Sequence, residues 1–424
     1  MQLASKFFAD IVKSVGSSGV QLVIMMVTTP LMTRLYDPAD YTSFGIINLM
    51  ATVIIGIGMM SMANVYPMEK DPERRTELLQ TMSLVVTILA LLSALAAFIM
   101  AIVGTLDLDP LTLALLPILV FSFGTRQTMV SVATQHANFT SLAVGQIAEP
   151  ITARSGSIAL GALFSSNPVF ILASVAAGHL VTALTVIKMA VNQSWRDWRT
   201  LLTNRPHPLT VIKRYSDFAI FNTPSHQALP LVMLAIQILI ASFFTHDMAG
   251  HYILAVSILT LPASVIGLAS APVIYRKFID IEHTNPDGLA RYLWRAIVFY
   301  LVSGTLILSP IFFFGEEIFG FVFGKVWVHA GEIASILSIP FVGGFTLMGV
   351  VSIFSVTRRM KMHFFLEVIT CAFMLIVIML SFRKIDFDTA MFYLAIIWSI
   401  RNIMLLSGCM MAANRHAHPT VQVS

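Results

Sequence analysis

Charged side chains inside long apolar stretches are the first feature of this sequence that could do chemistry. Arg126, Glu149, Arg154 and Arg401 each lie well within such a stretch, and Arg34 lies near the end of another. An ionisable side chain in the membrane interior costs about 2.5–3.5 kcal/mol on an insertion scale, so such positions tend to mark function. Three arginines against one glutamate leave a positive excess inside these stretches.

The sign of that excess indicates the kind of ligand. A guanidinium matches a phosphate group in bidentate fashion, so an arginine-rich cavity favours an anion, whereas a site for cationic drugs or sodium would favour carboxylates. Two other interpretations stay open. Glu149 could pair with an arginine and hold helices together, and Arg126 could extend its head group to a nearby interface. Glu149 and Arg154, five residues apart with Pro150 between them, do not stack on one helix face.

Motifs of soluble enzymes are missing from the sequence. It contains no P-loop, HExxH, GxSxG or CxxC pattern, so we expect no enzyme activity and no ATP hydrolysis within this chain. His136, His179 and His226 are scattered without ligand spacing, so no metal site is predicted. The sequence indicates no cofactor.

The elements that must position these residues are membrane-spanning helices. Of the 424 residues, 57% are hydrophobic and only 11% are charged, against about 25% charged in soluble domains. A span needs about 20 apolar residues. Seven runs lack any charge, namely Ser14–Thr33, Tyr41–Met68, Leu78–Leu106, Phe218–His246, Met248–Tyr275, Ala296–Gly315 and Ile333–Thr357. Five further spans are expected at about 111–132, 139–164, 169–188, 364–382 and 390–413. The sequence therefore predicts an all-α polytopic membrane protein of about twelve spans.

A hydrophilic stretch at about 191–216 divides the predicted spans into two sets of six. We expect two six-helix bundles, residues 1–200 and 201–424, around a central cavity, as in transporters built from repeats. Trp195 and Trp198 in the stretch suggest a short interfacial helix, and a plain linker is the alternative.

The basic residues predict the orientation of the chain. Most of its 26 lysines and arginines fall in loops on one side if both termini lie on that side, and such loops are cytoplasmic. We expect an inner-membrane protein with both termini in the cytoplasm and a first helix that is retained. The basic loops face anionic lipid headgroups, so nucleic acid is not an expected partner.

Two segments carry a resemblance to a known family, and the eighth span is similar as well. The first hairpin and the stretch after the ninth span resemble the polysaccharide flippases (Wzx-like) of the multidrug/oligosaccharidyl-lipid/polysaccharide (MOP) exporter superfamily. The matching positions are Pro30, Arg34, Leu35, Pro38, Tyr41 and Gly45, then Phe323, Gly324, Trp327, Ala330, Gly331 and Leu337. The resemblance extends over essentially the whole length, including the plan of two bundles.

The resemblance implies movement of an undecaprenyl-pyrophosphate-linked oligosaccharide, such as an O-antigen repeat unit, from the cytoplasmic to the periplasmic leaflet. It also implies alternating access and coupling to protons or sodium, with a polysaccharide polymerase and a chain-length regulator as candidate partners. Arg34, Arg126, Arg154 and Arg401 are then the candidate substrate-binding residues. Glu149 is the first candidate for ion coupling and Asp217, at the start of the seventh span, the second, although neither lies in a matched motif.

Two other functions compete with this interpretation. An ion-coupled drug exporter of the MATE type shares the superfamily, but its cationic substrates fit an arginine-rich interior poorly. A membrane enzyme such as an O-antigen polymerase should carry a large extramembrane loop, which the sequence lacks.

Overall fold

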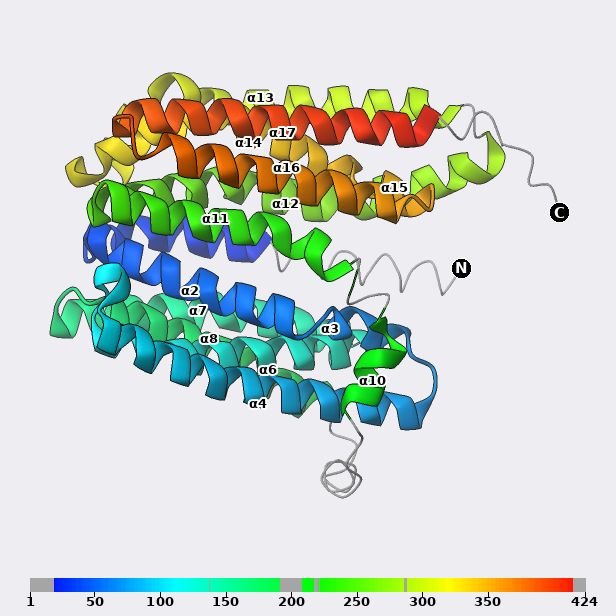
Figure 1. The fold of residues 1–424 in the computed structure, drawn as a ribbon, viewed down its shortest axis with the longest axis horizontal. Helices are drawn as coiled ribbons and strands as arrows, with labels where there is room; N and C mark the ends of the chain where they lie inside the picture. Colours follow the sequence, from blue (N-terminus) through cyan, green and yellow to red (C-terminus); the bar gives the residue numbers. More distant parts are fainter. Residues whose placement is uncertain are drawn as a thin grey trace. The chain divides into compact units, whose positions relative to one another are not determined.

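The computed structural model describes residues 19–136, 138–190, 208–216, 220, 222–285 and 288–414 (Figure 1), and the secondary structure of these residues is helical with no strand. The chain divides into two compact units, Met1–Leu234 and Ala235–Ser424. The boundary between these units lies inside helix α11 (Thr223–Phe243). Trp195 and Trp198 lie outside the described residues.

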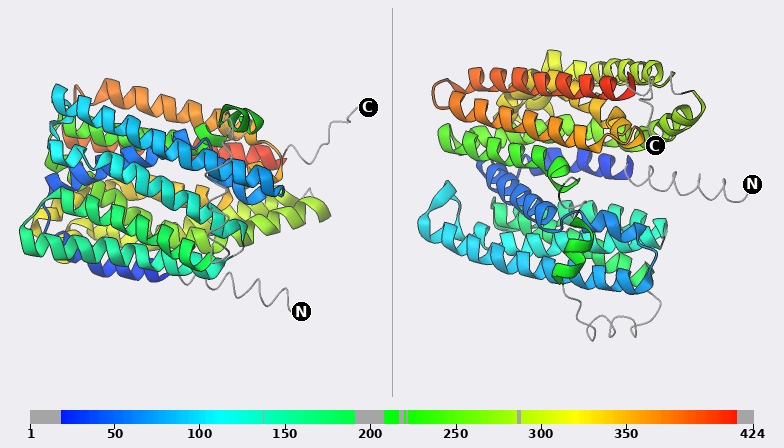
Figure 2. Two further views of the ribbon diagram at one scale, coloured as in Figure 1. Left: turned by 90° about the horizontal axis from the view of Figure 1, so that it is seen from below. Right: turned by 45° about the vertical axis from the view of Figure 1, so that its right-hand side comes forward.

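The N-terminal unit is a bundle of antiparallel helices (Figure 2). Its members are Gly19–Met32, α2 (Pro38–Gly58), α4 (Pro72–Val103), α5 (Pro110–Leu113), α6 (Leu116–Gln135), α7 (Phe139–Phe164), α8 (Pro168–Ala190) and the short α10 (Pro208–Arg214). α7 packs along α8, and α6 packs between α4 and α8. Three of these helices begin with a side chain that accepts a hydrogen bond from a backbone amide of the first turn, namely Asp71 for α4, Asp109 for α5 and Asn138 for α7.

The second span is shorter than its charge-free run. The sequence predicted Tyr41–Met68, but α2 ends at Gly58, and α3 (Met62–Val65) and the 3₁₀ turn Tyr66–Met68 follow. Met60 and Ser61 break the helix with φ values of 46° and 58°, in the left-handed region. The run contains no charge at the break, so hydropathy alone could not locate it.

The C-terminal unit contains α12 (His246–Thr284), α13 (Leu289–Val322), α14 (Val328–Val350), α15 (Ile353–Val356), α16 (Met360–Ser381) and α17 (Phe387–Asn414). α14 is central, because it packs against α12, α13 and α17. Gly315 of α13 and Gly331 of α14 face each other so closely that a Cβ on Gly331 would strike the backbone of Gly315. Small residues at such crossings let membrane helices approach closely.

A helix lies at each position where the sequence predicted a span. Among the described residues, nine helices are long and apolar enough to cross a membrane, and Gly19–Met32 is a shorter apolar helix. These properties confirm the predicted class, a polytopic all-α membrane protein.

Candidate functional site

A cavity of about 290 Å³ opens within the N-terminal unit. Its walls come from the helix Gly19–Met32 and from α2, α6, α7 and α8. The polar side chains that line it are Gln21, Arg126, Glu149, Arg154, Ser157 and His179. Three of the residues singled out from the sequence, Arg126, Glu149 and Arg154, therefore meet in one cavity.

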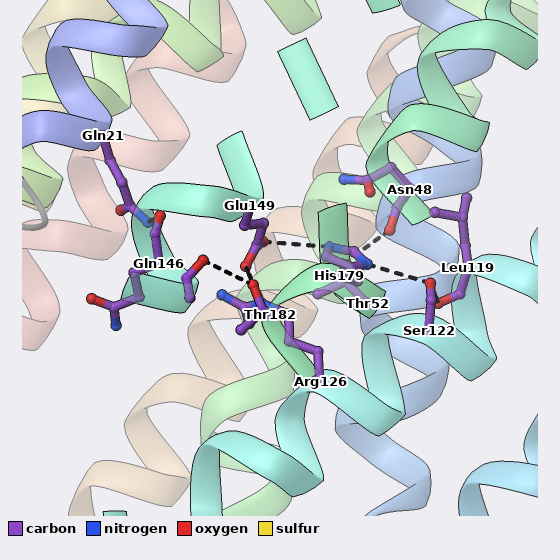
Figure 3. Close-up of polar contacts among 11 residues, drawn as sticks. Gln21, Asn48, Thr52, Leu119, Ser122, Arg126, Gln146, Glu149, His179 and Thr182 are labelled. Carbon is purple, nitrogen blue, oxygen red and sulfur yellow. Dashed lines mark hydrogen bonds and ion pairs between the residues drawn. The ribbon is translucent and has the colours of Figure 1, made fainter. Parts of the chain in front are cut away.

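Glu149 is the centre of a polar cluster (Figure 3). Its Oε2 lies 2.5 Å from Nε of Arg126 on α6 and 3.0 Å from the hydroxyl of Thr182 on α8. Its Oε1 lies 3.7 Å from Nε2 of His179, also on α8. The pairing between Glu149 and an arginine, one of the alternatives left open by the sequence, is thus present and joins three helices.

His179 is a member of this cluster that sequence reasoning did not select. Its ring lies 5.3 Å from that of Phe123, and its Nδ1 lies 3.5 Å from the hydroxyl of Ser122. A single histidine in an apolar helix has no spacing pattern, so only its neighbours identify it.

Pro150 explains how the wall of the cavity is built. Proline has no amide hydrogen, so it cannot bond to the carbonyl four residues earlier, which is that of Gln146. The side-chain amide of Gln21 donates to this carbonyl at 2.5 Å. A side chain of the first helix thereby donates to a carbonyl that the proline cannot bond.

Arg154 differs from Arg126 in its surroundings. Its Nη1 lies 2.9 Å from the sulfur of Met32, a weak acceptor. Among the described residues, no carboxylate lies within the 4.0 Å that defines an ion pair. With Arg126 neutralised by Glu149, the cavity carries one positive charge in excess, on Arg154.

The other candidate residues lie elsewhere. Arg34 is exposed in the turn that follows Met32. Arg401 of α17 is buried in the C-terminal unit, where it forms an ion pair and a hydrogen bond with Glu367 of α16. Asp217 lies outside the described residues.

Glu367 corrects the charge count made from the sequence. It lies inside the eleventh span, and its side chain is 7% exposed, but the count omitted it. The excess among these intramembrane groups is therefore one positive charge and not two. The neighbouring Asn402 donates to the carbonyl of Pro340 at 2.8 Å, so this second cluster connects α14, α16 and α17.

Comparison with solved structures identifies the fold. The inward-closed lipid II flippase MurJ superposes with a TM-score of 0.73 at 14% identity, covering 96% of this chain and 91% of that one. An inward-facing MATE multidrug resistance transporter of the MOP superfamily gives 0.63 at 12% identity, covering 94% and 98%. A mutant of the Vibrio cholerae MATE transporter VcmN gives 0.59 at 16% identity, covering 98% and 97%.

Sequence comparisons add nothing to this likeness. No protein-family model and no curated protein matches the chain. At these identities the structural likeness concerns the fold alone. The chain has the fold of the MurJ flippase and of MATE transporters, over nearly its full length.

Proposed function

We propose that this protein is a transporter that moves an undecaprenyl-pyrophosphate-linked oligosaccharide, such as an O-antigen repeat unit, across the bacterial inner membrane to the periplasmic leaflet. The likeness to a lipid II flippase supports the class of substrate. The sequence resemblance to polysaccharide flippases supports the oligosaccharide. The distribution of basic loop residues supports an orientation with both termini in the cytoplasm.

The observation that carries the proposal is the uncompensated charge of Arg154 in the cavity. Arg154 is partly buried. A guanidinium in such a place without a counter-ion is costly in a medium of low dielectric, and an incoming phosphate would offset this cost. Arg126 lies in the same cavity and could add a second donor. A cavity of about 290 Å³ is at the small end of ligand pockets, so it suits the charged head group and not the lipid tail.

Glu149 has a second role in this proposal, as the ion-coupling carboxylate. It already shares contacts with Arg126, Thr182 and His179. A phosphate that draws Arg126 away would leave Glu149 with less positive charge beside it, which favours uptake of a proton or of a sodium ion. Substrate binding and ion uptake would thus favour each other through one arginine.

A MATE-type drug exporter is the second candidate, and the same glutamate favours it. A carboxylate in a cavity of this fold could face a cationic drug, and two of the structures named above are MATE transporters. In that case Glu149, and not Arg154, would be the residue required for transport.

The test compares two arginines in a strain lacking the chromosomal gene. Arg154→Ala removes the unpaired cation of the cavity, and Arg291→Ala makes the same change at an exposed position of α13. Both variants are expressed at matched levels, and inverted vesicles report the leaflet that holds the lipid-linked oligosaccharide. We expect cytoplasmic accumulation in the deletion strain and with Arg154→Ala, and normal distribution with Arg291→Ala.

Two results would contradict the proposed function. Normal distribution and normal surface glycan with Arg154→Ala would reject the anion site. Resistance to cationic drugs that depends on Glu149, with no effect on lipid-linked oligosaccharide in the deletion strain, would favour the exporter.

A further inference from the structure

A second group of ionisable residues lies in the C-terminal unit, apart from the clusters described above. His329 and Glu332 lie at the start of α14, three residues apart and thus on one helix face. Asp388 lies in the first turn of α17. One ligand atom from each of the three lies within 4.8 Å of the other two. His329 Nδ1 and Glu332 Oε2 are only 2.9 Å apart.

Packing explains why residues 59 positions apart in the chain converge here. α14 and α17 pack along each other, and both begin at this place. The ring of Phe387, which precedes Asp388, lies 5.5 Å from the ring of His329.

A buried histidine provides independent evidence for a ligand. His251 of α12 is 8% exposed, and its ring lies 5.5 Å from that of His329. Its Nδ1 is buried and has no hydrogen-bond partner among the described residues. Nε2 of His329 is buried and without a partner in the same way. Buried polar atoms are normally satisfied, so two orphaned imidazole nitrogens at one place suggest a missing partner.

The donor set indicates which ion would fit. Imidazole nitrogen and carboxylate oxygen are ligands of Zn²⁺, which takes three or four protein donors, whereas Mg²⁺ and Ca²⁺ select oxygen alone. Two carboxylates would balance the charge of a divalent ion. Bonds of about 2.0–2.2 Å imply separations of roughly 3.3 Å between ligand atoms, so the side chains need only a small contraction from their present spread.

We propose that His329, Glu332 and Asp388 bind one Zn²⁺ ion, with His251 as the nearby imidazole that completes or orients the site. The ion would cross-link the first turn of α14 to the first turn of α17. The sequence alone suggested no metal site, because its ligands lie on two helices and have no common spacing motif. In the orientation that the basic loops predict, the site faces the periplasm. A metal ion bound there could exchange with the periplasmic solution.

The experiment uses the full-length protein purified in detergent and freed of metal by a chelator. Zn²⁺ binding is measured by titration calorimetry, and the melting temperature is measured with and without Zn²⁺. The variants are His329→Ala and Asp388→Asn. The control is Asp386→Asn, a neighbouring carboxylate whose oxygens bond to Thr389 and which is outside the group. Melting of each variant without metal shows whether it is folded.

We expect one Zn²⁺ per chain for the natural protein and for Asp386→Asn, with a rise in melting temperature on addition of the ion. His329→Ala and Asp388→Asn should each bind Zn²⁺ at least tenfold more weakly, and their melting temperatures should not rise when Zn²⁺ is added. Equal affinity in all four proteins, or less than a tenth of an equivalent bound by the natural protein, would overturn the proposal.

Discussion

Nε of Arg126 lies 2.5 Å from Oε2 of Glu149, and this contact joins α6 to α7 across the floor of a cavity that also holds Arg154. The two arginines thus have different electrostatic surroundings within one cavity. Arg126 pairs with a carboxylate of the protein, whereas Arg154 contacts the sulfur of Met32.

The Arg126–Glu149 pair should behave as a coupled unit in stability measurements. Arg126→Ala leaves a partly buried carboxylate, and we expect the free energy of unfolding to fall by about 1–3 kcal/mol. The double variant Arg126→Ala/Glu149→Gln should recover part of this loss, because no charge then remains unpaired. Thermal unfolding in detergent measures both, and strictly additive single-variant effects would contradict the coupling.

The Arg401–Glu367 pair is more deeply buried, with side chains 6% and 7% exposed. Arg401→Met should therefore cost about 3–5 kcal/mol, since it leaves an uncompensated carboxylate. We expect Arg401→Met/Glu367→Leu to restore stability. Export measured in the same double variant separates two roles. Restored export indicates that Arg401 holds helices together, whereas lost export in a stable protein supports its assignment to substrate binding.

The segment after the hydrophilic stretch is anchored to the first bundle by two contacts. Tyr215 donates a hydrogen bond to Glu69, and Arg214 lies 2.8 Å from Glu77 on α4. The bond from Tyr215, aided by the backbone amide of Asp71, holds the pKa of Glu69 below its usual value of 4.5. A lowered folded-state pKa adds stability above the unfolded-state pKa, which is lost as the pH falls through the folded value.

Tyr215→Phe should therefore lower the melting temperature at pH 7 and have a smaller effect at pH values below that usual pKa, where Glu69 becomes protonated. The measurement is a melting curve at each of several pH values from 3 to 7. A difference between the two proteins that stays constant over this range would show that the hydrogen bond does not depend on the charge of Glu69.

The close crossing of α13 and α14 should not tolerate a methyl group. Gly331→Ala places a Cβ against the backbone of Gly315, and we expect a loss of about 1–3 kcal/mol from overpacking. Gly344→Ala is the matched control on the same helix, because nothing lies within 4 Å of its added Cβ. That substitution should be neutral or slightly stabilising, since alanine favours helix. Equal melting temperatures for the two variants would contradict the close approach of α13 and α14 at Gly315 and Gly331.

The helix positions could be predicted because each span requires a long apolar run, and the runs are nearly free of charge. The end of α2 could not, because the break at Met60 and Ser61 changes the backbone and not the hydropathy. Backbone conformation of this kind depends on tertiary contacts, such as the one between Ser61 and Thr223 at 2.9 Å.

The partner of each charged residue could not be predicted from the sequence, for a related reason. Glu149 and Arg126 are 23 residues apart, and Arg401 and Glu367 are 34 apart, on different helices. Periodicity places a side chain on the face of its own helix but does not say which neighbouring helix faces it. His179 illustrates the same limit, since its significance comes only from its proximity to Glu149.

The bond from Gln21 to the carbonyl of Gln146 has a consequence for the evolution of the cavity. The glutamine donates to a carbonyl that Pro150 cannot bond, and this donor makes the proline easier to accommodate within the helix. Across related chains the two positions should be inherited as a pair, so that lineages replacing the proline also lose the glutamine, even though the two lie on separate helices.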